Sequence, residues 1–260
     1  PHRRRERTMS EFRSGFACFV GRPNAGKSTL TNAIVGEKIA ITSSRPQTTR
    51  RVIRGILNRP DAQLVLVDTP GLHRPRTLLG QRLNALVYET WSEVDVIGVC
   101  LPSDQRVGPG DEFLIRQIAD LPHPPKLVAL ATKIDLVKPA RLAEHLASIG
   151  ALEEQLGIRW ESVIPVSAVS GEQVEIVVDE IIKLLPPGPA WYPDGETTDE
   201  PIEVRVGELI RESLLESVVE EVPHSIAIEI DEIRDKEGSD PDNPVTEVFA
   251  SIVLERNSQK

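Results

Sequence analysis

Apolar residues along the first 185 positions follow two alternating patterns. Short apolar runs, typical of buried strands, fall at 16–20, 52–57, 64–67, 94–101, 127–131 and 163–166. Between and after them, apolar residues recur at helical spacing, and we predict helices at 79–87, 112–119, 140–156 and 172–185. Asp111 is the expected N-cap of the second helix. Such alternation predicts an α/β fold, with a mostly parallel sheet and helices on both faces.

The pattern changes after residue 185. The sequence P-P-G-P at 186–189 ends the last helix, and residues 186–201 are rich in Pro, Gly, Asp and Thr, which predicts an interdomain linker. We expect Trp191 and Tyr192 within it to dock on one of the two domains. Beyond the linker, the spacing predicts one helix along 206–218 and two strands, 225–233 and 245–254.

A glycine-containing loop follows the first predicted strand. Residues 21–28, G-R-P-N-A-G-K-S, fit the pattern G-x-x-x-x-G-K-S between a strand and a helix. Loop N–H groups and a helix N-terminus attract phosphate, Lys27 can reach the outer phosphates, and the Ser28 hydroxyl can bind Mg²⁺. The predicted nucleotide-binding residues here are Gly21, Arg22, Pro23, Asn24, Ala25, Gly26, Lys27, Ser28 and Thr29.

Two later segments indicate that the base is guanine. The sequence T-K-I-D at 132–135 follows a predicted strand and resembles the N/T-K-x-D guanine motif. The Asp135 carboxylate only accepts hydrogen bonds, which suits the two adjacent donors of guanine and not the acceptor that adenine presents. The aliphatic part of Lys133 can pack on the base. Because Thr132 is shorter than the Asn of many relatives, we expect weaker binding with unchanged specificity.

The second segment is Ser167-Ala168, at the end of the strand at 163–166. It resembles the S-A-[KLM] loop, in which a backbone N–H contacts the guanine carbonyl. Both residues are therefore predicted to bind the nucleotide.

Two segments between these motifs predict contacts to the γ-phosphate and Mg²⁺. The sequence D-T-P-G at 68–71 follows a predicted strand, and all four of its residues, Asp68, Thr69, Pro70 and Gly71, are predicted to lie at the nucleotide. We expect Asp68 to hold Mg²⁺ through water and the Gly71 N–H to bind the γ-phosphate. In the loop R-P-Q-T-T-R at 45–50, a threonine can close over Mg²⁺, and we favour Thr49 over Thr48. Loops of this kind act as switches that order with the γ-phosphate.

Taken together, the motifs resemble those of the bacterial Era GTPases, in the Era/TrmE-like branch of the P-loop GTPases. The resemblance is carried by G-R-P-N-A-G-K-S-T-L, R-P-Q-T-T-R and D-T-P-G-L-H, and it extends along the whole chain. It implies a GTP-hydrolysing switch that acts in assembly of the small ribosomal subunit and binds small-subunit ribosomal RNA. It also implies a cytoplasmic protein with a peripheral inner-membrane fraction, and a K⁺ ion held by Asn24 that supports hydrolysis.

The resemblance also suggests how the chain is divided. We expect a basic, disordered extension at 1–10, an Era-type GTPase domain at 11–185, a linker at 186–201, and a partial KH-like (type II) domain at 202–260 that lacks the G-x-x-G loop. Residues 196–260 contain 18 acidic and 6 basic residues, a net charge of −12, against +2 for residues 1–195. A surface that binds phosphates needs the opposite sign, so we expect weak RNA binding by this chain.

The predicted catalytic residues are Lys27, Gly71 and Thr49, which would act by positioning and charge stabilisation. Ras-type enzymes orient the attacking water with a Gln directly after D-x-x-G, and Leu72 occupies that position here. One alternative is therefore a guanine-nucleotide sensor that hydrolyses little without a partner. A more distant alternative is a relative of the tRNA-modifying GTPases.

Composition agrees with these predictions. A chain of 260 residues with 40% hydrophobic content suffices for one or two domains with real cores. Cys18 and Cys100 lie in apolar runs, which predicts reduced core thiols. No apolar run approaches the ~18–20 residues of a membrane span, and no hydrophobic segment follows the basic N-terminus, so we expect no signal peptide.

Overall fold

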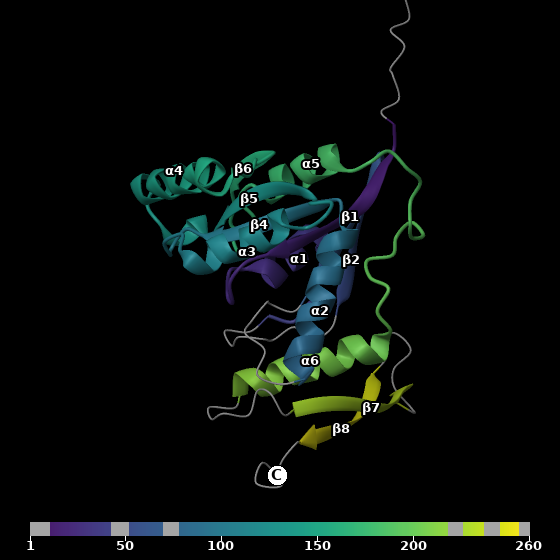
Figure 1. The fold of residues 1–260 in the computed structure, drawn as a ribbon. Coiled ribbons are helices and arrows are strands. Elements are labelled where there is room, and N and C mark those ends of the chain that lie inside the picture. The colour runs from purple at the N-terminus through teal and green to yellow at the C-terminus, as the bar shows by residue number, and fades with distance from the viewer. Residues whose placement is uncertain (1–10, 43–51, 70–77, 218–225, 237–244, 255–260) are drawn as a thin grey trace, which may run out of the picture.

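A computed structural model describes residues 11–42, 52–69, 78–217, 226–236 and 245–254 of the chain. A six-stranded sheet with helices on both faces is followed by a linker and by a smaller unit of one helix and two strands (Figure 1). The strands are β1 (Arg13–Val20), β2 (Ile53–Arg59), β3 (Ala62–Asp68), β4 (Val96–Pro102), β5 (Lys126–Thr132), β6 (Ser162–Pro165), β7 (Ile226–Asp235) and β8 (Thr246–Leu254). The helices are α1 (Lys27–Val35), α2 (Leu78–Glu93), α3 (Pro109–Ala119), the short 3₁₀ helix η1 (Ile134–Leu136), α4 (Pro139–Leu156), α5 (Val174–Leu184) and α6 (Ile202–Ser217).

The order of the large sheet is β2-β3-β1-β4-β5-β6. Only the β2–β3 pair is antiparallel, so the carboxyl ends of the other five strands lie along one edge. Strand β1 lies between β3 and β4, and the loop after β1 leaves the sheet there. The helix that follows β1 covers one face of the sheet, and the helix that leads to β4 covers the other. Ligands of open α/β sheets bind at such a position. The predicted α/β fold is thus confirmed, and it places the phosphate loop at the expected edge.

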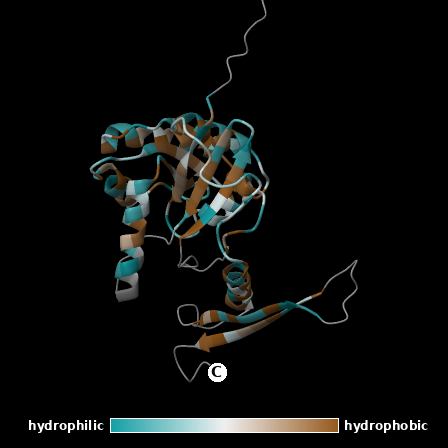
Figure 2. Cartoon of the chain, turned by 90° about the vertical axis from the view of Figure 1, so that its right-hand side faces the viewer, coloured by the Kyte–Doolittle hydropathy of each residue, from teal (hydrophilic) through white to brown (hydrophobic). Residues whose placement is uncertain are grey.

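The large sheet separates two hydrophobic cores. Helices α1 and α5 cover one face, where Leu30 and Val177 are fully buried against the strands. Helices α2, α3 and α4 cover the other face, with Trp91 and Ile115 buried. Figure 2 shows the strands as mostly hydrophobic and the surrounding helices as mixed in character. The sequence pattern predicted this arrangement, with strands that are buried on both faces and helices that are apolar on one face.

Most predicted elements are confirmed within two residues at their ends, but the interpretation of Asp111 was wrong. Helix α3 begins at Pro109 and not after Asp111, and its N-cap is Gly108. Asp111 instead accepts a hydrogen bond from the Gly108 N–H at 3.0 Å. The carboxylate therefore stabilises the helix from inside its first turn, because proline at the start had already set the helical backbone.

Both cysteines are free and buried, as predicted. Cys18 lies on β1 and Cys100 on β4. Burial raises the pKa of both thiols, to about 12 for Cys100, so both stay protonated at neutral pH.

The linker after α5 runs along the open edge of the large sheet. The Ile56 N–H of β2 donates to the Thr197 carbonyl at 2.8 Å. Buried Gln63 accepts hydrogen bonds from the N–H groups of Trp191 and Tyr192, at 2.7 and 3.0 Å. The expected docking of these two aromatic residues is therefore confirmed, and they dock on the large sheet. Covering the edge of β2 also protects it from pairing with another chain.

The smaller unit consists of α6 packed on the antiparallel pair β7–β8. The helix also contacts the first unit through buried Glu212, which accepts a hydrogen bond from the Thr42 N–H at 2.8 Å. The Lys38 ammonium lies 2.5 Å from the same carboxylate. A helix followed by an antiparallel pair fits a partial KH-like domain. The domain boundaries themselves stay predictions.

Candidate nucleotide-binding site

The loop after β1 has the backbone of an anion-binding turn. Asn24 and Gly26 have positive φ angles of 61° and 93°. Asn tolerates this region better than most residues, and Gly adopts it without strain. At Gly21 a side chain would place its Cβ 2.6 Å from the Cys100 carbonyl oxygen, so only glycine lets the loop leave the sheet here. The loop then enters α1, whose first turn offers N–H groups to a phosphate.

Lys27 is the first residue of α1, and its side chain turns back over the loop. The ammonium donates to the carbonyl oxygens of Gly21 and Arg22, each at 3.1 Å. Burial of the amine lowers the pKa of Lys27. A phosphate placed in the loop would favour the charged form and offer the ammonium a better partner. The structure therefore holds the predicted phosphate-binding lysine inside the loop.

Two of the three predicted Mg²⁺ residues, Ser28 and Asp68, lie together. The Ser28 hydroxyl, at the start of α1, donates to the Asp68 carboxylate, at the end of β3, at 2.9 Å. Asp68 is buried. A hydroxyl and a carboxylate are the hard oxygen donors that Mg²⁺ prefers, so the residues present fit this ion.

The guanine motif lies at the end of β5. Lys133 has a left-handed backbone with φ 59°, and the exposed Asp135 follows on the short helix η1. Its carboxylate accepts a hydrogen bond from the Ser167 hydroxyl at 2.6 Å. That hydroxyl accepts in turn from the Ser170 N–H at 3.1 Å. The unusual backbone at Lys133 and the contact with Ser167 fix the direction of the carboxylate.

Ser167 and Ala168 are predicted to contact the base through a backbone N–H of their loop, and this contact stays a prediction. The Ser167 N–H itself donates to the Glu172 carbonyl at 3.0 Å. Its side chain instead orients Asp135. No sequence signal indicated this role, because only the pairing of β5 with β6 brings residues 135 and 167 together.

Thr132 bridges the base motif and the phosphate loop. Its hydroxyl donates to the Ala25 carbonyl at 2.8 Å, and both groups are buried. The short threonine side chain thus reaches the phosphate loop directly. Weaker nucleotide binding on account of Thr132 stays a prediction.

Several predicted residues lie outside the described parts of the chain. They are Thr48, Thr49, Pro70, Gly71 and Leu72. Thr69 is the last described residue before the gap, and it is buried. The two predicted switch loops therefore stay sequence predictions.

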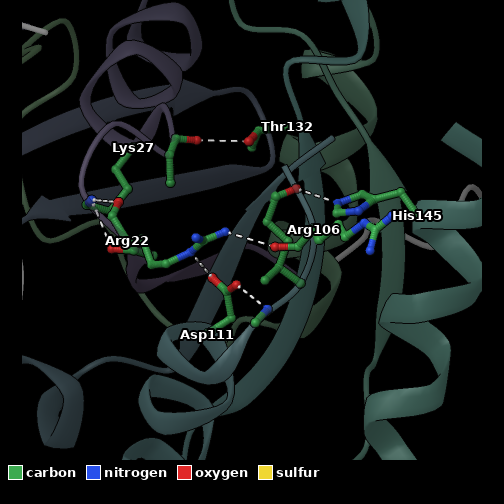
Figure 3. A network of polar contacts seen from close by, with 10 residues as sticks. Arg22, Lys27, Arg106, Asp111, Thr132 and His145 are labelled. Carbon is green, nitrogen blue, oxygen red and sulfur yellow. Dashed lines mark hydrogen bonds and ion pairs between the residues drawn. The ribbon is translucent and has the colours of Figure 1, made fainter. Parts of the chain in front are cut away.

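One polar network beside the loop was not predicted from the sequence. The Arg22 side chain points away from the loop toward α3 and contacts Asp111 and the Arg106 carbonyl (Figure 3). In the same view, buried His145 of α4 contacts the Leu101 carbonyl at 3.0 Å. The sequence signals for Arg22 were its place in the loop and an Asp early in a later helix, which only the fold brings together.

Comparison with known proteins identifies the family. A family model described as "50S ribosome-binding GTPase" matches residues 16–133. The chain is 57% identical over 248 residues to GTPase Era of Streptomyces coelicolor, covering 95% of this chain and 78% of that protein. It is 58% identical over 252 residues to GTPase Era of Mycobacterium avium, covering 97% and 82%.

The chain belongs to the Era GTPase family.

Solved Era structures share its architecture. An Era variant from Aquifex aeolicus bound to GDP and AlF4⁻ superposes with a TM-score of 0.86 at 30% identity, over 96% of this chain and 81% of that one. An Era complex with MgGDPNP and nucleotides 1506–1542 of 16S ribosomal RNA gives 0.85 at 30% identity, with the same coverage. The predicted family and enzyme class are thus confirmed: this member of the family is a GTPase, which converts GTP to GDP and phosphate. Among the residues that the structure describes, no helix combines the length and apolar character needed to cross a membrane.

Proposed function

We propose that this GTPase is a nucleotide-dependent switch in small ribosomal subunit assembly, and that it binds small-subunit ribosomal RNA. The observation that carries the proposal is the grouping of Lys27, the Ser28–Asp68 pair and the Ser167–Asp135 pair at one edge of the sheet. An Era complex of the same architecture contains MgGDPNP and a 16S ribosomal RNA fragment. We further expect a cytoplasmic location with a peripheral inner-membrane fraction, which rests on the resemblance alone.

The chain itself supplies binding, orientation and charge stabilisation. The loop N–H groups and the N-terminus of α1 hold the phosphates, and Lys27 exchanges its two carbonyl partners for phosphate oxygens. Asp135, aimed by Ser167, accepts the two guanine donors. We assign the γ-phosphate contacts to Thr49 and the Gly71 N–H. No covalent intermediate with the protein is needed, because water attacks the γ-phosphate directly and catalysis depends on positioning and electrostatics.

We assign Mg²⁺ to Ser28 and Asp68, with Thr49 as the third residue. When bound, this ion neutralises charge that develops on the β- and γ-phosphate oxygens. The Ser28 hydroxyl and the Asp68 carboxylate already lie 2.9 Å apart and require little rearrangement to serve one ion.

Glu212 offers a route by which a nucleotide-dependent change would reach the smaller unit. Its carboxylate accepts hydrogen bonds from the Thr42 N–H and the Thr42 hydroxyl, at 2.8 and 3.1 Å. Thr42 is the last described residue before the segment that contains Thr49. A change in that segment on γ-phosphate binding would therefore act directly on α6. A switch needs such a contact between the nucleotide site and a second unit.

Hydrolysis should depend on K⁺ if Asn24 holds a monovalent ion. Asn24 is exposed in the turn of the loop, and its side-chain amide oxygen is a suitable ligand for a monovalent cation. We expect phosphate release by the wild type to slow several-fold when Na⁺ replaces K⁺ at constant ionic strength, and Asn24→Ala to remove the difference. Equal wild-type rates in both salts would reject this role.

The same assay bears on the sensor alternative, which the Leu72 position favours. Phosphate release by purified protein is followed over hours in K⁺. Steady turnover without a partner supports the self-sufficient enzyme. A single burst or none, with GTP still bound, would instead support a sensor whose hydrolysis requires an activator.

RNA binding by the 260-residue chain should be weak and salt-dependent. Residues 196–260 carry a net charge of −12, which repels a phosphate backbone. We expect filter binding to detect little preference for nucleotides 1506–1542 of 16S ribosomal RNA over a scrambled RNA, and affinity that disappears as salt rises. A version continued past Lys260 with a G-x-x-G segment of a relative should bind tightly and specifically. Tight, salt-resistant and specific binding by the shorter chain would place the RNA site within residues 1–260.

A further inference from the structure

The side chain of Arg22 points out of the phosphate loop and is held by the start of α3. Its Nε donates to the Asp111 carboxylate at 2.8 Å, and a terminal nitrogen donates to the Arg106 carbonyl at 3.2 Å (Figure 3). Arg22 is 31% exposed, whereas Asp111 is 1% exposed. A carboxylate so deeply buried is costly to leave without its cation, so this pair holds Arg22 in one position.

The anchor itself is rigid. Asp111 lies in the first turn of α3, where the helix dipole favours a negative charge. Its second oxygen accepts the Gly108 N–H at 3.0 Å. Gly110 leaves room for the arginine, because a Cβ there would lie 3.2 Å from the Arg22 Cδ. The first turn of α3 therefore binds this side chain and leaves space for it.

The backbone of Arg22 faces the catalytic lysine. Its carbonyl accepts from the Lys27 ammonium at 3.1 Å and from the Ala25 N–H at 3.2 Å. The position of Arg22 thus determines where the loop carbonyls, and with them Lys27, lie before the phosphates arrive.

A second hydrogen-bonded connection holds the phosphate loop at Ala25. Thr132 donates to the Ala25 carbonyl at 2.8 Å, and the Thr132 carbonyl accepts the Ser103 N–H at 2.8 Å. The segment from 103 to 111 is therefore connected to the phosphate loop at both Ala25 and Arg22. Only the connection at Ala25 is made by a residue of the predicted guanine motif, Thr132.

We propose that Arg22 is a positioning residue for GTP hydrolysis and that Asp111 is its anchor. The pair presets the phosphate loop so that Lys27 and the loop N–H groups meet the transferring phosphate without rearrangement. Stabilisation of developing charge depends on such preset groups, and a displacement of about 1 Å can cost about 100-fold in rate. This inference rests on the proposed function of the same loop in phosphate binding and hydrolysis.

The test compares Arg22→Ala, Arg22→Lys, Asp111→Asn and the Arg22→Ala/Asp111→Asn double variant. Arg116→Ala and Asp104→Asn are matched controls, because both residues are exposed and have no side-chain partner among the described residues. The assays are steady-state GTP hydrolysis, fluorescent GDP binding and thermal melting with GDP bound.

We expect Arg22→Ala to lower kcat by about tenfold or more, since misplacement of catalytic groups acts on the chemical step. Arg22→Lys should recover part of the loss, because one donor still reaches Asp111. The double variant should lose no more than Arg22→Ala, because residues that act as a unit have non-additive effects. Asp111→Asn keeps the shape of the anchor and tests the charge alone, with an intermediate loss of kcat. Both controls should match the wild type.

Two results would overturn the inference. One is an unchanged kcat in Arg22→Ala and Asp111→Asn, with only a lower melting temperature, which would make the pair purely structural. The other is additive losses in the double variant. Failure of the proposed function looks different: the wild type would then neither bind GDP nor release phosphate.

Discussion

Replacing Lys27 by Ala should abolish GTP turnover and leave the chain folded. The ammonium is the only side-chain cation that the described structure places inside the phosphate loop, where it contacts the Gly21 and Arg22 carbonyls. Loss of one preorganised charge-stabilising group costs about 10²–10³-fold in rate, and this lysine also contributes to phosphate binding. Ser28→Ala should have a comparable effect, because it removes one of the three oxygen-bearing side chains assigned to Mg²⁺. Phosphate release at saturating GTP is the measurement, with circular dichroism as the test of folding.

Matched controls separate the site from general effects. Lys138→Ala removes an exposed lysine with no side-chain partner in the described parts of the chain. Ser92→Ala removes a hydroxyl that donates only to the Tyr88 carbonyl of its own helix. Both should hydrolyse GTP at the wild-type rate. Unchanged turnover in Lys27→Ala or Ser28→Ala would contradict the assignment of these residues to the phosphates and the metal.

Asp135→Asn should change the preferred base from guanine to xanthine. The Asp135 carboxylate can only accept hydrogen bonds, and the Ser167 hydroxyl holds it in position at 2.6 Å. An Asn there presents a donor, which opposes a guanine donor and suits the carbonyl of xanthine. A site built to pair with particular donors and acceptors discriminates by about 10⁴-fold or more, so GTP affinity should fall steeply while XTP affinity rises.

Competition against a fluorescent guanine nucleotide measures this exchange. Asp194→Asn, at an exposed position in the linker, is the matched control and should keep the wild-type preference. Equal binding of ATP and GTP by the wild type would contradict the guanine assignment. A variant that loses GTP without gaining XTP would show that Asp135 supports the local structure and does not select the base.

The sequence determined the elements that depend on local order along the chain. The loop at 21–28 was predictable because glycine spacing, a preceding apolar strand and a following helix all lie within twenty residues. The α/β class followed from strands and helices of alternating pattern, and the guanine motif from its place at a strand end. Local order was insufficient at α3, where the helix begins at Pro109, three residues before the start at 112 that the apolar pattern predicted.

Only the tertiary structure decided which distant residues meet. Arg22 reaches Asp111 because β1 and β4 are neighbours in the sheet, which brings α3 beside the phosphate loop. Ser167 reaches Asp135 because β6 pairs with β5, and Glu212 reaches Thr42 because α6 packs against the segment after α1. Each contact joins residues separated by 32 to 170 positions. No spacing rule spans such separations, because the register of the strands and the packing of the helices determine them.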